Sequence, residues 1–459
     1  MVRWDTISLF LPKVFVKLAA IGRNIGTAGL RLKPLMRRIS QLEASARAVT
    51  DWLALAALYE QSEQLDPLNH RLPANRGNVL WLSDRPQDAL RCYWRAALLD
   101  QSNPVVLRGL GNVHLDLNAF ELAERAYARS LALEPAALTA WNYSQLLIGL
   151  ERYVEGYRLA EQRWAMPGHA PWRDPSAHMA TMPEQLCERL LVWSEQGLGD
   201  TLQHLRWIGP LQAHRGPAAK PLVLEVEPCL VPLLQQSIAP QAGSIEVRAK
   251  ASSGPETFSG RHVSLLSLPW LLGGAPLPAE ATWLTWPEWR PPRPWPSHAP
   301  RIGLVWSAGR KLDDPVTARE YYRRSLHPEA LGQLIEGLHR LGIGAVLLQF
   351  GEDRSQADPW RNLVADELPV EADFAATAAF VADLDLVITV DTSMAHLVGA
   401  MQRRGWLLLP HAAAPRWLRQ RDDTPWYPSL RLFRQPSPSD WHGLVKRVLR
   451  ELELGLEFG

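Results

Sequence analysis

A repetition with a period of 34 residues runs through the first third of the chain and limits its fold more than any other feature. The residues that coincide under this shift are Gly77 with Gly111, Ala89 with Ala123, Tyr59 with Tyr93 and Tyr127, and residues 65–67 with 99–101 and 133–135. Chance does not produce such a register. A period of roughly 20 to 50 residues is typical of stacked supersecondary units, which bury their apolar faces against their neighbours. We therefore predict a solenoid over residues 40–165.

The pattern resembles tetratricopeptide repeats, and this resemblance implies roughly three or four helical hairpins. Small residues at the repeated positions let paired helices approach closely, the tyrosines fill the gap between them, and prolines end the units. Solenoids of this kind present a concave face and usually bind peptides or partner proteins. We therefore expect the repeats to bind a protein partner or to recruit the acceptor, and we interpret their aromatic residues as core.

Composition places the chain among globular proteins. Its 459 residues are 47% hydrophobic and carry a formal net charge of +1, which predicts two or three domains and no nucleic acid as the main partner. The three cysteines, Cys92, Cys187 and Cys229, are widely spaced and odd in number, so they predict neither a disulfide framework nor a zinc site. A reducing, cytoplasmic compartment fits this pattern best.

Residues 1–39 form a basic segment ahead of the repeats. The first 42 residues contain eight Lys or Arg and one acidic residue, Asp5. Their apolar stretch, residues 9–21, is interrupted by a proline and two lysines, so it is too short and too charged for a transmembrane helix or a secretory signal. Two interpretations stay open: peripheral contact with an anionic membrane at its inner face, or, as we favour, a solvated helix that caps the solenoid.

From residue 166 onward, short apolar runs alternate with helical stretches, which is typical of parallel α/β folds. The strand candidates are residues 190–194, 222–226, 245–247, 263–268, 302–306, 345–350, 386–390 and 406–409. Residues 287–300 are so rich in proline, among several tryptophans, that we interpret them as a stiff linker. Two Rossmann-like lobes that face a cleft would follow, residues 166–286 and 301–459.

The junction after residues 386–390 predicts a phosphate site. A buried strand ends there, the polar run Asp391, Thr392 and Ser393 follows, and a helix that carries His396 comes next. Free backbone N–H groups and the positive end of the helix dipole favour phosphate at such a place. The alternative is that one of the three polar residues only caps the helix.

A second strand, glycine-rich loop and helix start lies upstream, at residues 190–201. Gly197 and Gly199 either let the backbone approach a substrate closely or form a simple turn. Asp200, which follows them, is either a catalytic carboxylate or a helix N-cap. The agreement of two such junctions in separate lobes favours a functional interpretation of both.

These strings resemble the GT-B glycosyltransferases, in particular the heptosyltransferase-like family nine. The matching strings are residues 195–200, 302–306, 373–378, 384–397 and 426–435, within a coverage of about residues 186 to 450. The resemblance implies transfer of a sugar from a nucleotide-diphosphate sugar, held by the C-terminal lobe, to a protein or envelope-glycan acceptor at the N-terminal lobe. Residues 307–311 and the expanded stretch 312–322 depart from the family pattern, which leaves the sugar open. We interpret Arg416 as packing near the cleft or as a nucleotide contact.

The resemblance also implies roles for single residues. It makes Asp200 the base that accepts the acceptor's proton, and Glu195 and His204 are nearby alternatives. It puts Arg324 on a donor phosphate, together with the helix start at residues 391–396. No aspartate pair with metal-binding spacing follows a strand, so we favour a metal-independent reaction with no cofactor besides the nucleotide sugar. The alternative is a catalytically silent relative in which the repeats act as an interaction scaffold.

Overall fold

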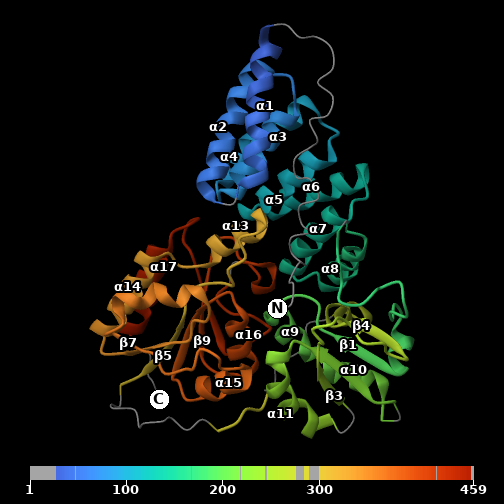
Figure 1. Cartoon of the computed structure of the whole chain (residues 1–459), viewed down its shortest axis with the longest axis vertical. Helices are drawn as coiled ribbons and strands as arrows, with labels where there is room; N and C mark the ends of the chain where they lie inside the picture. Colours follow the sequence, from blue (N-terminus) through green and yellow to red (C-terminus); the bar gives the residue numbers. More distant parts are fainter. Residues whose placement is uncertain are drawn as a thin grey trace.

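The computed structural model describes residues 27–46, 48–166, 168–217, 219–242, 245–274, 284–288, 299–419 and 421–455. The apolar stretch 9–21 and most of the predicted linker, residues 289–298, lie outside the described residues, so the interpretations of both stay predictions. Figure 1 shows a stack of helices, coloured blue to teal, above two α/β lobes that lie side by side.

Within the described part of the chain, eight helices form the stack, and each packs on the next. They are α1 (Thr27–Ser45), α2 (Val49–Leu65), α3 (Arg71–Leu82), α4 (Pro86–Leu99), α5 (Pro104–Asp116), α6 (Phe120–Leu133), α7 (Ala137–Gly149) and α8 (Tyr153–Ala160). Because α1 starts at Thr27, the stack begins before residue 40, and the end of the predicted basic segment is its first helix.

The repeated tyrosines and glycines pack against each other. An ideal Cβ at Gly109 would lie 2.3 Å from the Tyr93 ring, and one at Gly111 would lie 2.5 Å from the Tyr127 ring. Both rings are buried. Any side chain at these two glycines would displace a ring that lies directly on the backbone of a neighbouring helix. The predicted stack of helical repeats is therefore confirmed.

Two parallel sheets follow. The first has the strand order β3-β2-β1-β4, with β1 (Leu190–Trp193), β2 (Leu222–Val226), β3 (Ile245–Ala249) and β4 (Arg261–Ser264). The second has the order β10-β9-β8-β5-β6-β7, with β5 (Arg301–Val305), β6 (Gly344–Leu347), β7 (Val364–Ala365), β8 (Leu386–Val390), β9 (Gly405–Leu409) and β10 (Leu430–Arg434). The order reverses between β1 and β4 and between β5 and β8. Ligands of Rossmann-like folds bind at such reversals, outside the carboxyl ends of the strands.

Helices surround both sheets. They are α9 (Leu198–His204), α10 (Ile208–Arg215), α11 (Val231–Ala242) and α12 (Leu268–Leu271) in the first lobe, and α13 (Pro315–Arg324), α14 (Pro328–Arg340), α15 (Phe374–Ala382), α16 (Ser393–Ala400) and α17 (Trp441–Glu453) in the second. Strands β1, β2, β8 and β9 are buried along their whole length, as expected for parallel sheets that are covered on both faces. One continuous apolar cluster joins both lobes and α8. The predicted succession of a helical-repeat solenoid and two Rossmann-like lobes is confirmed.

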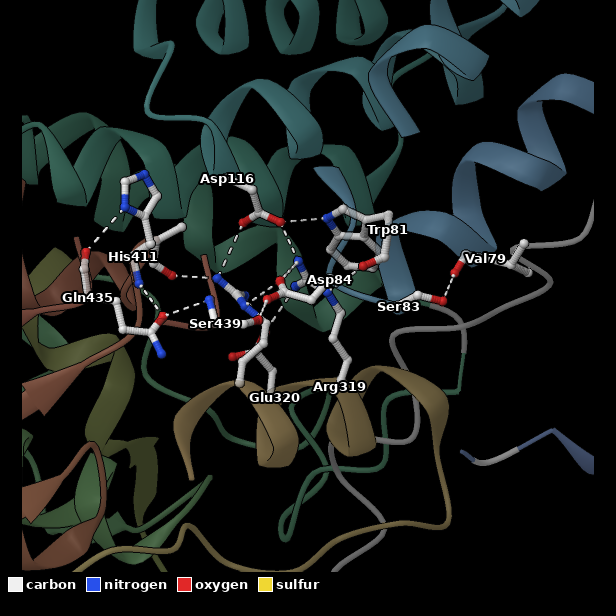
Figure 2. Close-up of polar contacts among 12 residues, drawn as sticks. Val79, Trp81, Ser83, Asp84, Asp116, Arg319, Glu320, His411, Gln435 and Ser439 are labelled. Carbon is white, nitrogen blue, oxygen red and sulfur yellow. Dashed lines mark hydrogen bonds and ion pairs between the residues drawn. The ribbon is translucent and has the colours of Figure 1, made fainter. Parts of the chain in front are cut away.

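The stretch 312–322, which departs from the family pattern, forms most of α13 and attaches the second lobe to the solenoid. Asp314 caps the helix by accepting hydrogen bonds from the N–H groups of Val316 and Thr317. Figure 2 shows Arg319 extending from α13 to Trp81 and Asp116 of the solenoid. The Arg319 Nε donates to the Trp81 carbonyl oxygen at 2.7 Å, and the Arg319 Nη2 donates to Asp116.

Candidate active site

The helix start after β8 lies where the two lobes meet, as Figure 1 shows for α16 and α9. Thr392 is the N-cap of α16, because its Oγ1 accepts a hydrogen bond from the Met394 N–H at 3.2 Å. Thr392 therefore does cap the helix, as the alternative interpretation expected of one of the three polar residues. Thr392 and Ser393 are nevertheless partly exposed, whereas Asp391 is buried. A single cap satisfies only part of the donors at a helix start, so this end of α16 keeps N–H groups that suit an anion.

Two cationic side chains come from the segment between β5 and α14. Arg324 ends α13, and its Nη1 donates to the Asp391 carbonyl oxygen at 3.1 Å. Lys311 lies in the loop between β5 and α13 and is partly buried. Burial lowers the pKa of the Lys311 ammonium, Asp200 opposes this shift, and Arg324 adds to it. The charges of Asp200 and Arg324 thus both act on Lys311, although the three groups come from separate segments.

Asp200 is the third residue of α9, and the N-cap is Gly197. The Asp200 Oδ2 accepts a hydrogen bond from the Gly197 N–H at 3.1 Å, so the carboxylate does cap the helix, but from the N3 position rather than from the N-cap. Its Oδ1 accepts from Arg416 Nη2 of the other lobe at 2.6 Å. Burial alone would raise the Asp200 pKa, but Arg416 outweighs burial and holds that pKa at about 2.

His396 is buried between the lobes and does not line an open cleft. An ideal Cβ at Gly199 would lie 2.7 Å from the His396 Cδ2, so α9 touches the imidazole directly. Arg416 Nη1 lies 3.4 Å from the His396 Nε2, and the Tyr427 hydroxyl lies 3.0 Å from the Nδ1. Because a guanidinium only donates, Nε2 is the acceptor and Nδ1 carries the proton. Burial, reinforced by Arg416, lowers the His396 pKa well below its ordinary value, so the ring is neutral at pH 7.

A second contact between the lobes lies beside this histidine. Arg206, just after α9, donates from Nη2 to the Trp426 carbonyl oxygen at 2.9 Å. The Arg206 guanidinium also lies 4.7 Å from the ring centroid of Tyr427, which in turn contacts His396. Such stacking of arginine on aromatic rings is favourable when it is sheltered from water. The lobes are thus closed on each other at α9 and α16.

Glu195 and His204, the alternative bases, have different surroundings. Glu195 is buried in an ion pair with Arg163, whose Nε lies 2.9 Å away and belongs to the 3₁₀ helix η2 (Glu161–Ala165) at the end of the solenoid. Burial would raise the Glu195 pKa, but Arg163 holds it below its usual range. Glu195 therefore joins the solenoid to the first lobe.

The imidazole of His204 hydrogen-bonds from Nδ1 to the Asp200 carbonyl oxygen at 2.8 Å. Burial lowers the His204 pKa to about 4. His204 is therefore neutral at pH 7, and its Nε2 is the proton acceptor.

The structure thus brings most of the predicted residues to one place and separates one from them. Asp200, Gly199, His396 and the helix start at residues 391–393 meet at the lobe junction, with Gly197 and His204 on either side of Asp200. Arg324 lies at the same helix start. Glu195 is the residue that is separated from this group, because it forms a buried ion pair with Arg163. Sequence reasoning did not single out Lys311, and no local pattern connects Arg416 with Asp200, which is 216 residues away. The one available signal for Lys311 was its place just beyond the carboxyl end of β5, at the reversal of strand order.

Neither a metal cluster nor a membrane span is found in the described parts of the chain. Among those residues, no three His, Cys, Asp or Glu side chains are grouped so that they could hold a metal ion. The helices of the same ranges include none with both the length and the apolar character needed to cross a bilayer.

The fold is a solenoid of helical repeats joined to two Rossmann-like α/β lobes. No protein-family model matches the chain. The chain is 24% identical over 375 residues to the protein FlbA of Caulobacter vibrioides, an alignment that covers 74% of this chain and 59% of FlbA. It thus spans less than two thirds of the length of that relative.

Solved structures with similar folds exist for the second part and for the whole layout. E. coli ADP-heptose LPS heptosyltransferase II is 13% identical, with a TM-score of 0.37, and the match covers 58% of this chain and 99% of that structure. The Thermobaculum terrenum O-GlcNAc transferase is also 13% identical, with a TM-score of 0.31 and 85% coverage of both chains. At these identities the likeness concerns the fold alone.

Proposed function

We propose that this protein is a glycosyltransferase that moves a sugar from a nucleotide-diphosphate sugar to an acceptor, with the diphosphate at the α16 helix start. One observation carries the proposal: the α16 start, Lys311 and Arg324 converge on the lobe junction that also holds Asp200. This combination offers positive charge and N–H donors on one side and a carboxylate on the other. The diphosphate of the donor and the hydroxyl of the acceptor need these two kinds of group.

The proposed chemistry follows from where charge develops. When the bond between the sugar and the diphosphate breaks, negative charge grows on the leaving phosphate, and fixed donors and cations around it lower the barrier. Lys311, Arg324 and the α16 start supply this stabilisation in the proposal, and no metal ion is required for it. Asp200 accepts the proton of the acceptor hydroxyl as the new bond to the sugar forms.

The ion pair with Arg416 defines how Asp200 works in this proposal. With a pKa of about 2, the carboxylate is ionised throughout the physiological range and is ready to accept a hydrogen bond. It is also a weak base, because the most effective catalytic base has a pKa close to the working pH. We infer that the lobes separate at the α9–α16 contact to admit substrates, and that Asp200 becomes more basic when Arg416 turns from it to the donor.

A catalytically silent relative is the second candidate, and a specific observation favours it. Both oxygens of Asp200 are engaged, one by the Gly197 N–H and one by Arg416, and His396 fills the space between the lobes. In this alternative the same residues only hold the lobes together, and the solenoid serves as the interaction scaffold.

A ligand panel separates the candidates. Nucleoside diphosphates and nucleotide sugars with each of the common bases are tested by thermal shift and calorimetry, followed by an assay for release of nucleotide diphosphate. A ligand at a hundred times its dissociation constant adds about 2.7 kcal/mol to stability. Binding with turnover supports the transferase, binding without turnover supports the silent relative, and no binding by any member overturns the nucleotide site.

A further inference from the structure

The solenoid and the second lobe enclose a cavity that neither the site nor the proposed function has used. It has a volume of about 350 Å³. Solenoid helices α3 to α7 form one wall, and α13 with residues 412–419 forms the other. Gln196, which precedes Gly197 and the start of α9, also lines it. The cavity therefore reaches from the repeats to the loop that leads into α9, the helix of Asp200.

The charges that line this cavity do not balance. Its walls carry four guanidinium groups, of Arg108, Arg319, Arg323 and Arg419, against two carboxylates, of Asp116 and Glu320. Two of the four have ion-pair partners: Arg319 pairs with Asp116, and Arg323 pairs with Glu320 at 2.8 Å. No carboxylate among the described residues lies within ion-pair distance of the other two, Arg108 and Arg419.

Arg419 is the clearest case of an unused donor. Its Nε and Nη1 are buried and have no hydrogen-bond partner in the described part of the chain. The guanidinium lies 5.5 Å from the ring centroid of Phe120 at the start of α6. Burial lowers the Arg419 pKa to about 10, and the neighbouring Arg434 adds to this shift. A buried donor without a partner costs stability, about 1 to 3 kcal/mol and more for a charged group, so its presence points to a ligand.

Arg108, on α5, lines the solenoid wall of the cavity, opposite Arg419. Burial lowers the Arg108 pKa, and Glu134 partly opposes this shift. Burial and Asp116 raise the Tyr127 pKa, whereas Arg108 and Arg419 both oppose this rise, so the two guanidinium groups act on one side chain. The Tyr127 hydroxyl itself donates to the Asn112 Oδ1 at 2.8 Å. Two spare cations beside a satisfied tyrosine form an anion site whose partner does not come from the described residues.

The rest of the lining indicates which anion fits. The cavity is also lined by the indole rings of Trp81 and Trp141 and by five carboxamide side chains: Asn78, Asn112, Asn142, Gln145 and Gln196. A carboxamide both donates and accepts hydrogen bonds, as a peptide group does, whereas phosphate groups only accept at full charge. Guanidinium groups pair with carboxylates through two parallel hydrogen bonds. This mixture suits a polypeptide segment with acidic side chains.

We propose that the cavity binds an acidic polypeptide segment, with its carboxylates on Arg108 and Arg419 and its chain directed past Gln196 toward Asp200. As an acceptor site, this assignment rests on the proposed glycosyl transfer. As a binding site, it does not, because acidic-peptide binding requires no nucleotide.

The test uses the full chain and two labelled peptides, one of alternating serine and glutamate and one of alternating serine and glutamine. Binding is measured by fluorescence anisotropy without nucleotide, for the natural protein, for Arg108→Gln, for Arg419→Gln, and for Arg125→Gln as the matched control. Arg125 lies on α6 with Tyr127 but is exposed. Inorganic phosphate is the competitor, and thermal unfolding is recorded for every variant.

We expect the glutamate peptide to bind at least tenfold more tightly than the glutamine peptide, and both cavity variants to lose this preference while Arg125→Gln keeps it. We also expect Arg419→Gln to unfold at a temperature no lower than the natural protein, because it removes an unpaired buried charge. Equal binding of the two peptides, or a preference that survives in both cavity variants, overturns the proposal. Phosphate that binds in the cavity while the glutamate peptide does not overturns the polypeptide assignment. Peptide binding without any nucleotide binding leaves this site intact and refutes the proposed function.

Discussion

The two junctions that the second lobe makes with the rest of the chain differ in how completely their charges are satisfied. At the α13–solenoid junction, Arg319 and Arg323 are almost fully buried and lie among Asp84, Asp116 and Glu320, as Figure 2 shows for most of these residues. At the α9–α16 junction, Asp200 and Arg416 form a pair that is partly exposed, beside the cations Lys311 and Arg324. The cations of the first junction are neutralised by carboxylates of the protein itself. The second holds three cations, Lys311, Arg324 and Arg416, against the two carboxylates of Asp200 and Asp391, and this excess of positive charge is the condition for binding an anion.

The largest predicted effect concerns Asp200. It should show whether this residue acts in catalysis or only holds the two lobes together at the α9–α16 junction. Asp200→Asn keeps the size of the side chain but cannot accept a proton, so transfer should fall by roughly 10² to 10⁴. Arg416→Gln breaks the same ion pair and leaves the carboxylate in place, so its rate should fall less. The measurement is the initial rate of sugar transfer, with melting curves for both variants.

Both variants are needed, because Asp200 lies at N3 and carries an interlobe ion pair, so Asp200→Asn changes attachment as well as proton transfer. Equal losses of rate in both variants, matched by equal losses of stability, would assign Asp200 to attachment only. Removal of Arg416 should also let the Asp200 pKa rise from about 2. The acidic limb of the pH–rate profile should therefore move to higher pH in Arg416→Gln.

The next largest effect should appear at the α13–solenoid junction. Arg319→Ala leaves Asp116 buried without its main partner, and breaking a buried pair in this way costs about 3 to 5 kcal/mol. Urea unfolding of the full chain measures the loss. The matched control is Arg125→Ala on the exposed face of α6, for which a change within about 0.5 kcal/mol is expected.

The same junction should respond to acid. Burial would raise the Asp116 pKa, but Arg319 and Arg323 outweigh burial and hold it below its usual value. A depressed folded-state pKa gives stability that is fully present above the unfolded value of about 3.9 and is lost as the pH falls through the folded value. Stability should therefore drop below about pH 4 in the natural protein. An equally steep drop in Arg319→Ala would mean that other carboxylates cause it.

A smaller effect should appear at the proposed diphosphate site at the α16 start. Arg324→Gln and Lys311→Met each remove one cation from the α16 start, and a lost hydrogen bond to a charged group is worth about 1.5 to 3 kcal/mol. Calorimetry with a nucleoside diphosphate should show weaker affinity with an unchanged melting temperature of the free protein. His396→Ala is a poorer probe, because the imidazole is buried between Gly199, Arg416 and Tyr427. Unchanged affinity in both cation variants would remove the diphosphate from this place.

The smallest predicted effect tests the contact between the two lobes at α9 and α16. Gly199→Ala puts a Cβ 2.7 Å from His396, and overpacking of this kind costs about 1 to 3 kcal/mol. Gly209→Ala in α10 is the control, because no atom outside its own surroundings lies within 4 Å of its Cβ. The control should be neutral or gain about 0.5 to 1 kcal/mol from its helical position. If Gly209→Ala lowers the free energy of unfolding while Gly199→Ala leaves it unchanged, the lobes do not close at α9.

Sequence reasoning identified the fold because its signals are periodic and local. The 34-residue repetition predicted the stacked helices, and apolar runs predicted β2 and β8 at their observed bounds. Two strands were not predicted: β7 has only two residues, and in the edge strand β10 the apolar run is interrupted by Arg431 and Arg434. The helix α13 was not predicted from the sequence either.

Sequence alone determined the order of the modules and the two strand–helix junctions, because each depends on neighbouring residues whose spacing sets hydrogen bonding and burial. Tertiary structure alone decided the partners of the charged groups. It joined Asp200 to Arg416, Glu195 to Arg163 and Arg319 to Asp116 across the chain. Among the described residues, it left Arg108 and Arg419 without a carboxylate at ion-pair distance. These outcomes depend on how rigid layers meet, and a charge becomes functional or structural only when packing decides whether water, a protein partner or a ligand can reach it.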